Sequence, residues 1–372
     1  MLNLTLLVFV VAAADAPLAL ELRVAPELRA SFLLLPEENV PEAALEPLFT
    51  SLRAKGDTFC SMLHNQTPRK DDVATAFVDA GEWKRQKDTC RGCRFQVKAG
   101  CWNFFEMNDQ HPEDDFELVK ALFPGLQYDC YAVGMVQPYM MHNVLGCTNL
   151  SVVDFDWRIH DAHFQLLRKY RAGAMKDAAG LDAAVADVTI GWVAQTGRPK
   201  PSHPASVATF CEENQLAICR DHLLRFQETG KTLRALRLDL SALHEARYGQ
   251  PGDTTSSKVI FLSNAIEDIY TKKAEFERFM LSLHSALAVG QKAYLIHHVG
   301  AHRSFGLYLA EGGAKAAKVS TICRDPYSST ATNKTPGAPY EIWLDGVTTT
   351  TKPPPRCHYL LDQARKKALK TP

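Results

Sequence analysis

Two carboxylates stand at the end of an apolar run near the middle of the chain. The run is LSVVDFD (150–156), and its acidic residues Asp154 and Asp156 alternate, so an extended chain places both side chains on one face. In nucleotide-binding α/β folds, an acidic residue at the end of the second strand accepts hydrogen bonds from ribose hydroxyls. Either carboxylate could instead cap a following helix. The pattern predicts a polar site edge or a helix start here.

Polar residues also follow two apolar runs in the second half of the chain. After VIFL (259–262) come Ser263, Asn264, Glu267 and Asp268, and the run AYLIH (293–297) leads into His297, His298 and His302. Parallel βαβ units place ligands at the carboxyl ends of their strands. We therefore expect Glu267, His297 and His298 to edge a substrate pocket.

The segment 258–300 has the pattern of such a βαβ unit. Its two apolar runs suit strands that are covered on both faces. Between them, Phe276, Phe279, Met280, Leu283 and Leu287 recur at three- and four-residue spacing and form one apolar helical face. Gly290 follows as a left-handed C-cap that ends the helix. The segment therefore predicts strand, helix and strand.

Similar alternation occurs upstream of this unit. Strands are predicted at 129–136, 150–156 and 233–240, the last ending near Asp239, and helices at 138–145 and 158–171. We divide the chain into residues 1–14, a cysteine-containing region at 15–127, an α/β domain at 128–310 with a helical insertion at 173–232, and a C-terminal part at 311–372. That last part carries antiparallel edge strands at 316–322 and 340–344 and a helix at 359–369. The predicted fold class is α/β, a doubly wound, mostly parallel sheet with helices on both faces.

This order resembles the class I S-adenosylmethionine-dependent methyltransferases, which have a Rossmann-like fold. The resemblance is carried by VIFLSNAIEDIY and FMLSLHSALAVGQKAYLIHH, similar to the family's fourth strand, following helix and fifth strand. It implies an S-adenosylmethionine cofactor bound near Gly134, Asp154 or Asp156, Asp239 and Asn264, with methyl transfer to an unknown acceptor. Such transfer needs positioning more than acid–base chemistry. The family's glycine-rich loop is reduced here to AVGMVQPYMMHN, with Gly134 its single glycine.

Three other interpretations remain open. Asp154-x-Asp156 fits a lumenal glycosyltransferase that holds a nucleotide sugar through Mg²⁺ or Mn²⁺. Asp156, His160 and His163 could join the later histidines around Zn²⁺ or Fe²⁺. A nonenzymatic Rossmann-like binding protein, lacking the usual glycine loop, is the third. The chain contains no Gly-x-Ser-x-Gly elbow and no Walker-type phosphate loop.

Composition limits the partners and the compartment. Lys+Arg and Asp+Glu both number 42, so no basic surplus indicates a nucleic-acid partner. The run LNLTLLVFVVAAA (2–14) is too short for a stable membrane span but is typical of a cleavable signal peptide. The chain's ten cysteines then favour disulfides in the secretory pathway or outside the cell. Without a functional signal, the protein would be cytoplasmic.

Overall fold

The computed structural model describes residues 21–24, 39–65, 105–154, 156–191, 193–195, 198–200, 202–229, 233–238, 256–266, 271, 273–299, 302–325, 343–349 and 352–370. The predicted signal peptide at 1–14 and most of the cysteine-containing region lie outside these residues.

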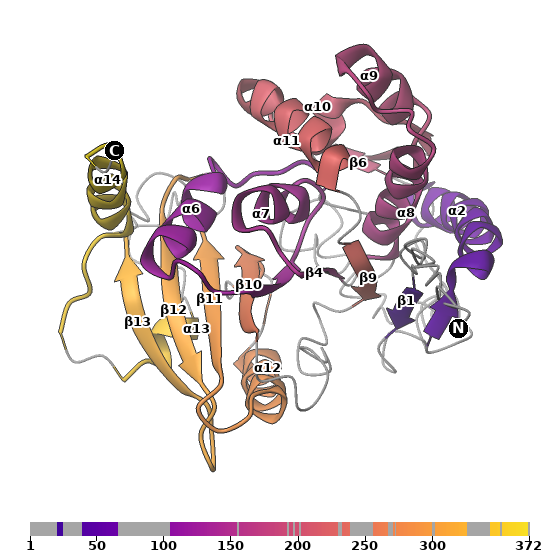
Figure 1. Ribbon diagram of the computed structural model, residues 1–372. Helices are drawn as coiled ribbons and strands as arrows, with labels where there is room; N and C mark the ends of the chain where they lie inside the picture. Colours follow the sequence, from indigo (N-terminus) through magenta and orange to yellow (C-terminus); the bar gives the residue numbers. More distant parts are fainter. Residues whose placement is uncertain are drawn as a thin grey trace, which may run out of the picture.

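One mixed sheet organises the described chain, with strand order β13-β12-β11-β10-β3-β4-β9-β1-β2 (Figure 1). The strands are β1 (Glu21–Val24), β2 (Asn39–Pro41), β3 (Tyr128–Ala132), β4 (Asn149–Asp154), β9 (Leu233–Leu238), β10 (Ser257–Ser263), β11 (Lys292–His298), β12 (Phe305–Glu311) and β13 (Lys318–Arg324). From β1 across to β11 every neighbouring pair is parallel. Strands β12 and β13 at one edge and β2 at the other are added antiparallel. A mixed, mostly parallel sheet of this kind is consistent with a Rossmann-like fold.

Some helices pack against this sheet, and those of the insertion at 173–232 pack on other helices. The described helices are α2 (Glu42–Asn65), α6 (Glu113–Leu122), α7 (Gln137–Leu145), α8 (Trp157–Arg171), α9 (Ala178–Ala186), α10 (Val207–Phe210), α11 (Leu216–Thr229), α12 (Lys273–Ala286), α13 (Trp343–Gly346) and α14 (Cys357–Ala368). In Figure 1, α7 lies above the central strands and α12 below them. Two short antiparallel pairs accompany the predicted insertion: β5 (Thr189–Ile190) with β8 (His203–Pro204), and β6 (Val193–Gln195) with β7 (Arg198–Lys200).

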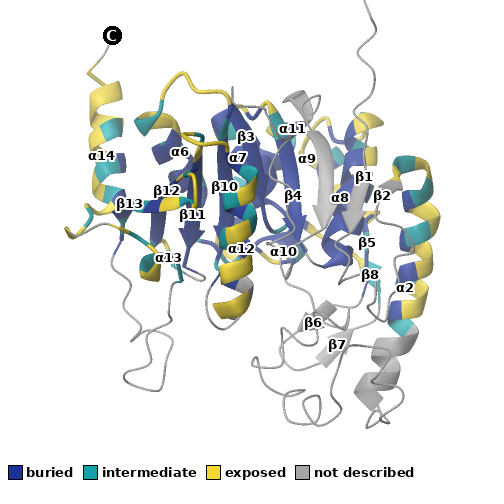
Figure 2. Cartoon of the chain, turned by 90° about the horizontal axis from the view of Figure 1, so that it is seen from below, coloured by how far each residue is buried: buried dark blue, intermediate teal, exposed yellow. Residues whose placement is uncertain are grey.

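The predicted βαβ unit is confirmed as β10, α12 and β11. Six of the seven residues of each strand are buried, as Figure 2 shows for the centre of the sheet. On one side of β10, the rings of Phe261 and Phe116 of α6 meet edge to face, 5.1 Å between centroids. Gly290 has the expected left-handed backbone, with φ of 81°, but it is not the C-cap of the helix: α12 ends at Ala286, and the Gly290 N–H donates to the Gly312 carbonyl at 2.8 Å in the turn before β11. The spacing of apolar residues thus identified two strands and a helix, all of which bury apolar side chains.

The predictions for the C-terminal part are only partly correct. The expected strand at 316–322 is β13, and it is antiparallel to β12, which the sequence did not predict. The expected strand at 340–344 is wrong for its last two residues, because Trp343 and Leu344 begin α13. Trp343 stacks near Phe276 of α12 and donates its indole N–H to the Thr271 carbonyl at 2.8 Å. These contacts hold Trp343 beside α12, whereas the end of the same segment reaches the edge of the sheet, where Thr348 forms an isolated bridge to Val319 of β13.

Three disulfides join described segments: Cys130–Cys147, Cys211–Cys219 and Cys323–Cys357. The first ties β3 to the turn before β4, and the third ties β13 to the first residue of α14. Disulfides form and persist in oxidising compartments, so these three indicate an extracytoplasmic environment. Cys90, Cys93 and Cys101 lie outside the described residues. None of the helices that the structure describes has the length and apolar character to cross a bilayer.

Candidate functional site

The candidate site lies where β3 and β10 end beside each other. Gly134, two residues after β3, has φ of 85°, and Ser263, the last residue of β10, has φ of 49°. The left-handed region is open to glycine but costs a residue with a side chain about 1 kcal/mol or more. In α/β sheets, ligands bind at the carboxyl ends of neighbouring strands where the strand order reverses. The chain leaves β3 toward β4 on one side, and β10 stands on the other, so this is such a point.

The side chain of Gln137 fills the space next to Gly134. A Cβ atom added to Gly134 would lie 2.6 Å from Gln137 Oε1, which is too close for any real contact. Gln137 Oε1 accepts a hydrogen bond from the Val136 backbone N–H at 3.1 Å. The missing Cβ of Gly134 therefore makes room for a residue of this chain.

Asp109, which precedes α6 in the chain, lies between the loop after β3 and the end of β10. Its carboxylate accepts from Ser263 Oγ at 2.8 Å to each oxygen and from Gln137 Nε2 at 3.0 Å, and its backbone carbonyl accepts from Gln215 Nε2 at 3.2 Å. Asp109 is fully buried. One carboxylate thus joins the loop after β3 to the end of β10. Asp109 was not predictable from the sequence, since no local pattern around it signals partners that lie 28 and 154 residues away.

The paired carboxylates of β4 are both engaged within the protein. Asp156 caps α8, accepting from the Arg158 backbone N–H at 3.0 Å, which is the helix-start interpretation. Its oxygens also accept two hydrogen bonds from the Arg158 guanidinium, Nε at 2.7 Å and Nη2 at 2.6 Å. Asp154 Oδ1 accepts from the Asp156 backbone N–H at 2.9 Å. All three side chains are buried.

Two histidines on α8 position the strand ends. His163 donates from Nε2 to the Gly134 carbonyl at 3.0 Å and accepts at Nδ1 from Tyr139 Oη at 2.7 Å. His160 donates from Nε2 to the Asp154 carbonyl at 2.8 Å. Burial lowers the pKa of His163 to about 4 and that of His160 to about 3, so both rings are neutral. Each ring holds a backbone carbonyl at the sheet edge.

The two histidines that end β11 have different surroundings. His297 donates from Nδ1 to the Ser263 carbonyl at 2.9 Å, and burial lowers its pKa to about 3. His298 donates from Nδ1 to Asp115 of α6 at 2.8 Å and from Nε2 to the His302 carbonyl at 2.6 Å. Burial favours the neutral ring of His298, but the Asp115 carboxylate outweighs it and raises the pKa to about 9. His298 is therefore a buried imidazolium.

The structure brings together only part of the predicted site. Gly134 and Asn264 lie on either side of the Asp109 network, and Asn264 Oδ1 is 3.4 Å from Ser263 Oγ. Helix α8 connects Asp154 to Gly134, because its His160 and His163 hold the backbone carbonyls of these two residues. Asp239 and Glu267 lie outside the described residues. Within the described part of the chain, no three His, Cys, Asp or Glu side chains are arranged to hold a metal ion.

The sequence was compared with family models and with curated proteins. Neither comparison found a match.

Proposed function

We propose that the protein is a nonenzymatic, extracytoplasmic relative of doubly wound Rossmann-like proteins. One observation carries the proposal: the Asp109 carboxylate joins Gln137 to Ser263 across the ends of β3 and β10. This is the position at which such folds bind their ligands. The Asp109 carboxylate therefore occupies the place that a polar group of a cofactor would take.

A nucleotide would have to replace several strong contacts at this position. Hydrogen bonds to a charged group contribute about 1.5–3 kcal/mol each. The ribose hydroxyls would also need Asp154, whose Oδ1 accepts from the Asp156 backbone N–H, or Asp156, whose carboxylate is bound by Arg158 in a buried pair. Breaking a buried pair leaves an uncompensated charge, which costs about 3–5 kcal/mol. These costs oppose cofactor binding in the family's usual position.

S-adenosylmethionine-dependent methyl transfer is the second candidate. The parallel order β9, β4, β3, β10 and β11 and the left-handed Gly134 after β3 favour it. Gly134, Asp154 or Asp156, Asp239 and Asn264 would then bind the cofactor, with Glu267, His297 and His298 at the acceptor pocket. This function requires Asp109 and Gln137 to separate when the ligand enters.

A metal-dependent glycosyltransferase fits these side chains less well. Both carboxylate oxygens of Asp156 accept hydrogen bonds from Arg158, and Asp154 accepts from the backbone. The carboxylates of Asp154 and Asp156, which would be the metal ligands, thus already accept hydrogen bonds without a divalent ion.

Calorimetric titration of the full chain separates these functions. We expect no saturable heat with S-adenosylmethionine up to about 1 mM, the upper end of usual substrate affinities. We expect none with a uridine diphosphate sugar and Mn²⁺ either. Micromolar binding of S-adenosylmethionine that Asp154→Asn or Asp156→Asn abolishes in a variant that still unfolds cooperatively in urea, and that the surface control Asp182→Asn leaves intact, would favour the methyltransferase. Binding of the nucleotide sugar only with Mn²⁺ would establish the glycosyltransferase. Either result overturns the proposal.

A further inference from the structure

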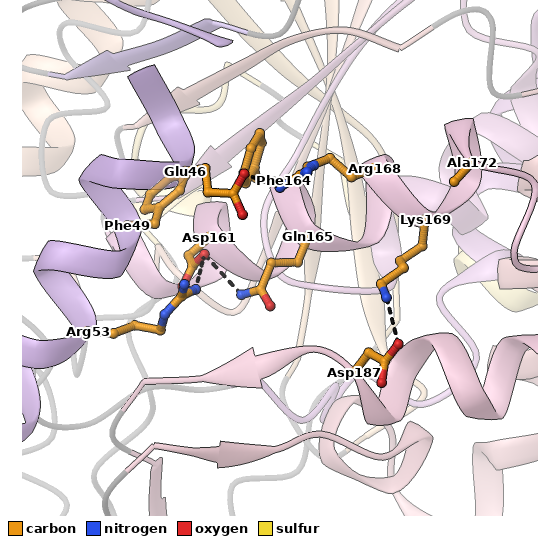
Figure 3. A pocket seen from close by; sticks show the side chains of 10 residues that line it. All are labelled: Glu46, Phe49, Arg53, Asp161, Phe164, Gln165, Arg168, Lys169, Ala172 and Asp187. Atoms are coloured by element: carbon orange, nitrogen blue, oxygen red, sulfur yellow. Dashed lines mark hydrogen bonds and ion pairs between the residues drawn. The ribbon is translucent and has the colours of Figure 1, made fainter. Parts of the chain in front are cut away.

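A cleft separate from the strand ends lies between α2 and α8 (Figure 3). Its volume is about 390 Å³, within the range of small-molecule sites. The lining side chains come from α2, from α8 and its C-terminal end, and from the residue after α9: Glu46, Phe49, Arg53, Asp161, Phe164, Gln165, Arg168, Lys169, Ala172 and Asp187. The cleft combines two aromatic rings with three basic and three acidic groups.

The inner part of the cleft is rigid. Phe49 and Phe164 are buried with ring centroids 5.7 Å apart, and they provide an apolar wall. Asp161 is also buried and accepts two hydrogen bonds from Arg53 Nη1, at 2.8 and 2.7 Å, and one from Gln165 Nε2 at 3.0 Å. Figure 3 shows the Asp161 carboxylate turned toward both partners. Arg53 is therefore held at the cleft by Nη1, which donates to both Asp161 oxygens, and by Nη2, which donates to Thr50 Oγ1 at 3.2 Å.

In the two outer ion pairs, the acidic side chains are more exposed than the basic ones. Arg168 pairs with Glu46 at 2.5 Å, and Lys169 with Asp187 at 2.7 Å. The two acids are 60% and 68% exposed, whereas Arg168 is 50%, Lys169 31% and Arg53 20% exposed. The Arg168 guanidinium also lies over the Phe164 ring, 5.6 Å from its centroid. Exposed pairs contribute little, so Glu46 and Asp187 can turn into solvent while the basic groups stay.

We propose that this cleft binds a small organic dianion with an apolar body, such as a phosphate monoester or a dicarboxylate. When Glu46 and Asp187 turn outward, Arg53, Arg168 and Lys169 face the ligand with only Asp161 opposing them, which leaves two positive charges. The anionic group replaces the two exposed acids, and the apolar body lies over Phe49 and Phe164, which become accessible as Glu46 turns away. This site is independent of the strand ends and does not rest on the proposed function.

Titration of the full chain with phenyl phosphate at low ionic strength tests the site. Phenyl phosphate joins a dianion to an aromatic ring, and low salt avoids screening of exposed charges. We expect saturable binding that Arg168→Gln and Lys169→Gln each weaken about tenfold, because each removes a charge-assisted contact. Glu46→Gln removes a competing anion and should tighten binding. The matched control is Arg220→Gln. Arg220 is an exposed arginine of α11 that lies outside the cleft and pairs with Asp182 of α9 at 3.0 Å.

Three outcomes would overturn the proposal. The first is no saturable binding by wild type or Glu46→Gln, and the second is affinity that Arg168→Gln and Lys169→Gln leave unchanged. The third is equal affinity for benzyl alcohol, which would show that the anion contributes nothing. A loss of fold does not explain tighter binding, so the Glu46→Gln result distinguishes the site from a structural effect. Dicarboxylate and phosphate ligands of the same size, compared on the wild type, distinguish the two sources of the dianion.

Discussion

At the scale of the residue, Arg158 is the largest fully buried side chain among the described residues, and Asp156 is what makes its burial tolerable. Replacing Arg158 with Met leaves the Asp156 carboxylate buried without its counter-ion. We expect a loss of about 3–5 kcal/mol in the free energy of unfolding, measured by urea denaturation. The double change Asp156→Asn with Arg158→Met removes both charges and keeps an amide oxygen that can cap α8. It should be more stable than Arg158→Met alone, and a double variant of equal or lower stability would contradict this account.

At the scale of the element, α6 is attached to the molecule through consecutive acids in its first turn. Asp114 binds Arg303 at 2.5 Å and Arg365 of α14 at 2.7 Å, and Asp115 binds His298 of β11 at 2.8 Å. The edge-to-face contact of Phe116 with β10 completes the attachment. Helix α6 is therefore fixed by charge at its start and by packing along its length.

This attachment predicts a dependence of stability on pH. The pKa of His298 is about 9 in the folded protein and about 6.5 in an unfolded chain. Because the folded pKa is the higher one, the added stability is complete below about pH 6.5 and is lost as the pH rises through about 9. Asp109 adds to the effect of Asp115 on His298. His358, whose pKa its hydrogen bond to Asp325 raises, acts in the same direction.

Urea midpoints measured from pH 8 to pH 10, above the pKa of unfolded histidines and of Asp115, would show this decline in the wild type. The variant Asp115→Asn with His298→Gln keeps amide groups at both positions and removes the charge pair, so its decline should be smaller, with the part due to His358 remaining. His142→Gln is the control, because burial lowers the pKa of His142 to about 4 and an unfolded histidine titrates near 6.5, so this ring is neutral in both states over this range. An identical pH profile for the double variant and the wild type would show that His298 is not the group responsible.

The parallel strands from β9 to β11 and the helix α12 were predictable from the sequence, but the hydrogen bonds and ion pairs between side chains of different elements were not. The spacing of Phe276, Phe279 and Leu283 identifies α12, because an amphipathic helix records its buried face in its own sequence. Strand β12 was missed, although its alternation is as local as that of β13. Asp109 cannot be recognised this way, since it acts through residues that only the folded sheet brings beside it. The capping of α8 by Asp156 was one of two interpretations that the sequence allowed, and its pairing with Arg158 was not predictable, because it depends on the burial of both side chains.

At the scale of the whole molecule, disulfides contribute to holding the described parts together. Cys323–Cys357 closes a loop of 34 residues and anchors α14, whereas Cys211–Cys219 closes one of 8. In the chain-entropy model a cross-link stabilises by restricting the unfolded chain, and the effect increases with loop length. Replacing both cysteines of the longer loop with Ala should therefore cost about 4 kcal/mol, against about 2.5 kcal/mol for the shorter loop.

Equilibrium urea unfolding of the two double-alanine variants, under oxidising conditions, measures both costs. The longer loop carries an additional consequence, because α14 keeps its ion pairs of Arg365 with Asp114 and Glu117 after the disulfide is removed. Raising the salt concentration should then weaken the Cys323→Ala, Cys357→Ala variant more than the wild type, since exposed pairs are screened. Equal costs for the two disulfides would contradict the loop-length account. An equal response to salt would mean that the packing of Leu361 and its neighbours, and not Arg365, holds α14 in place.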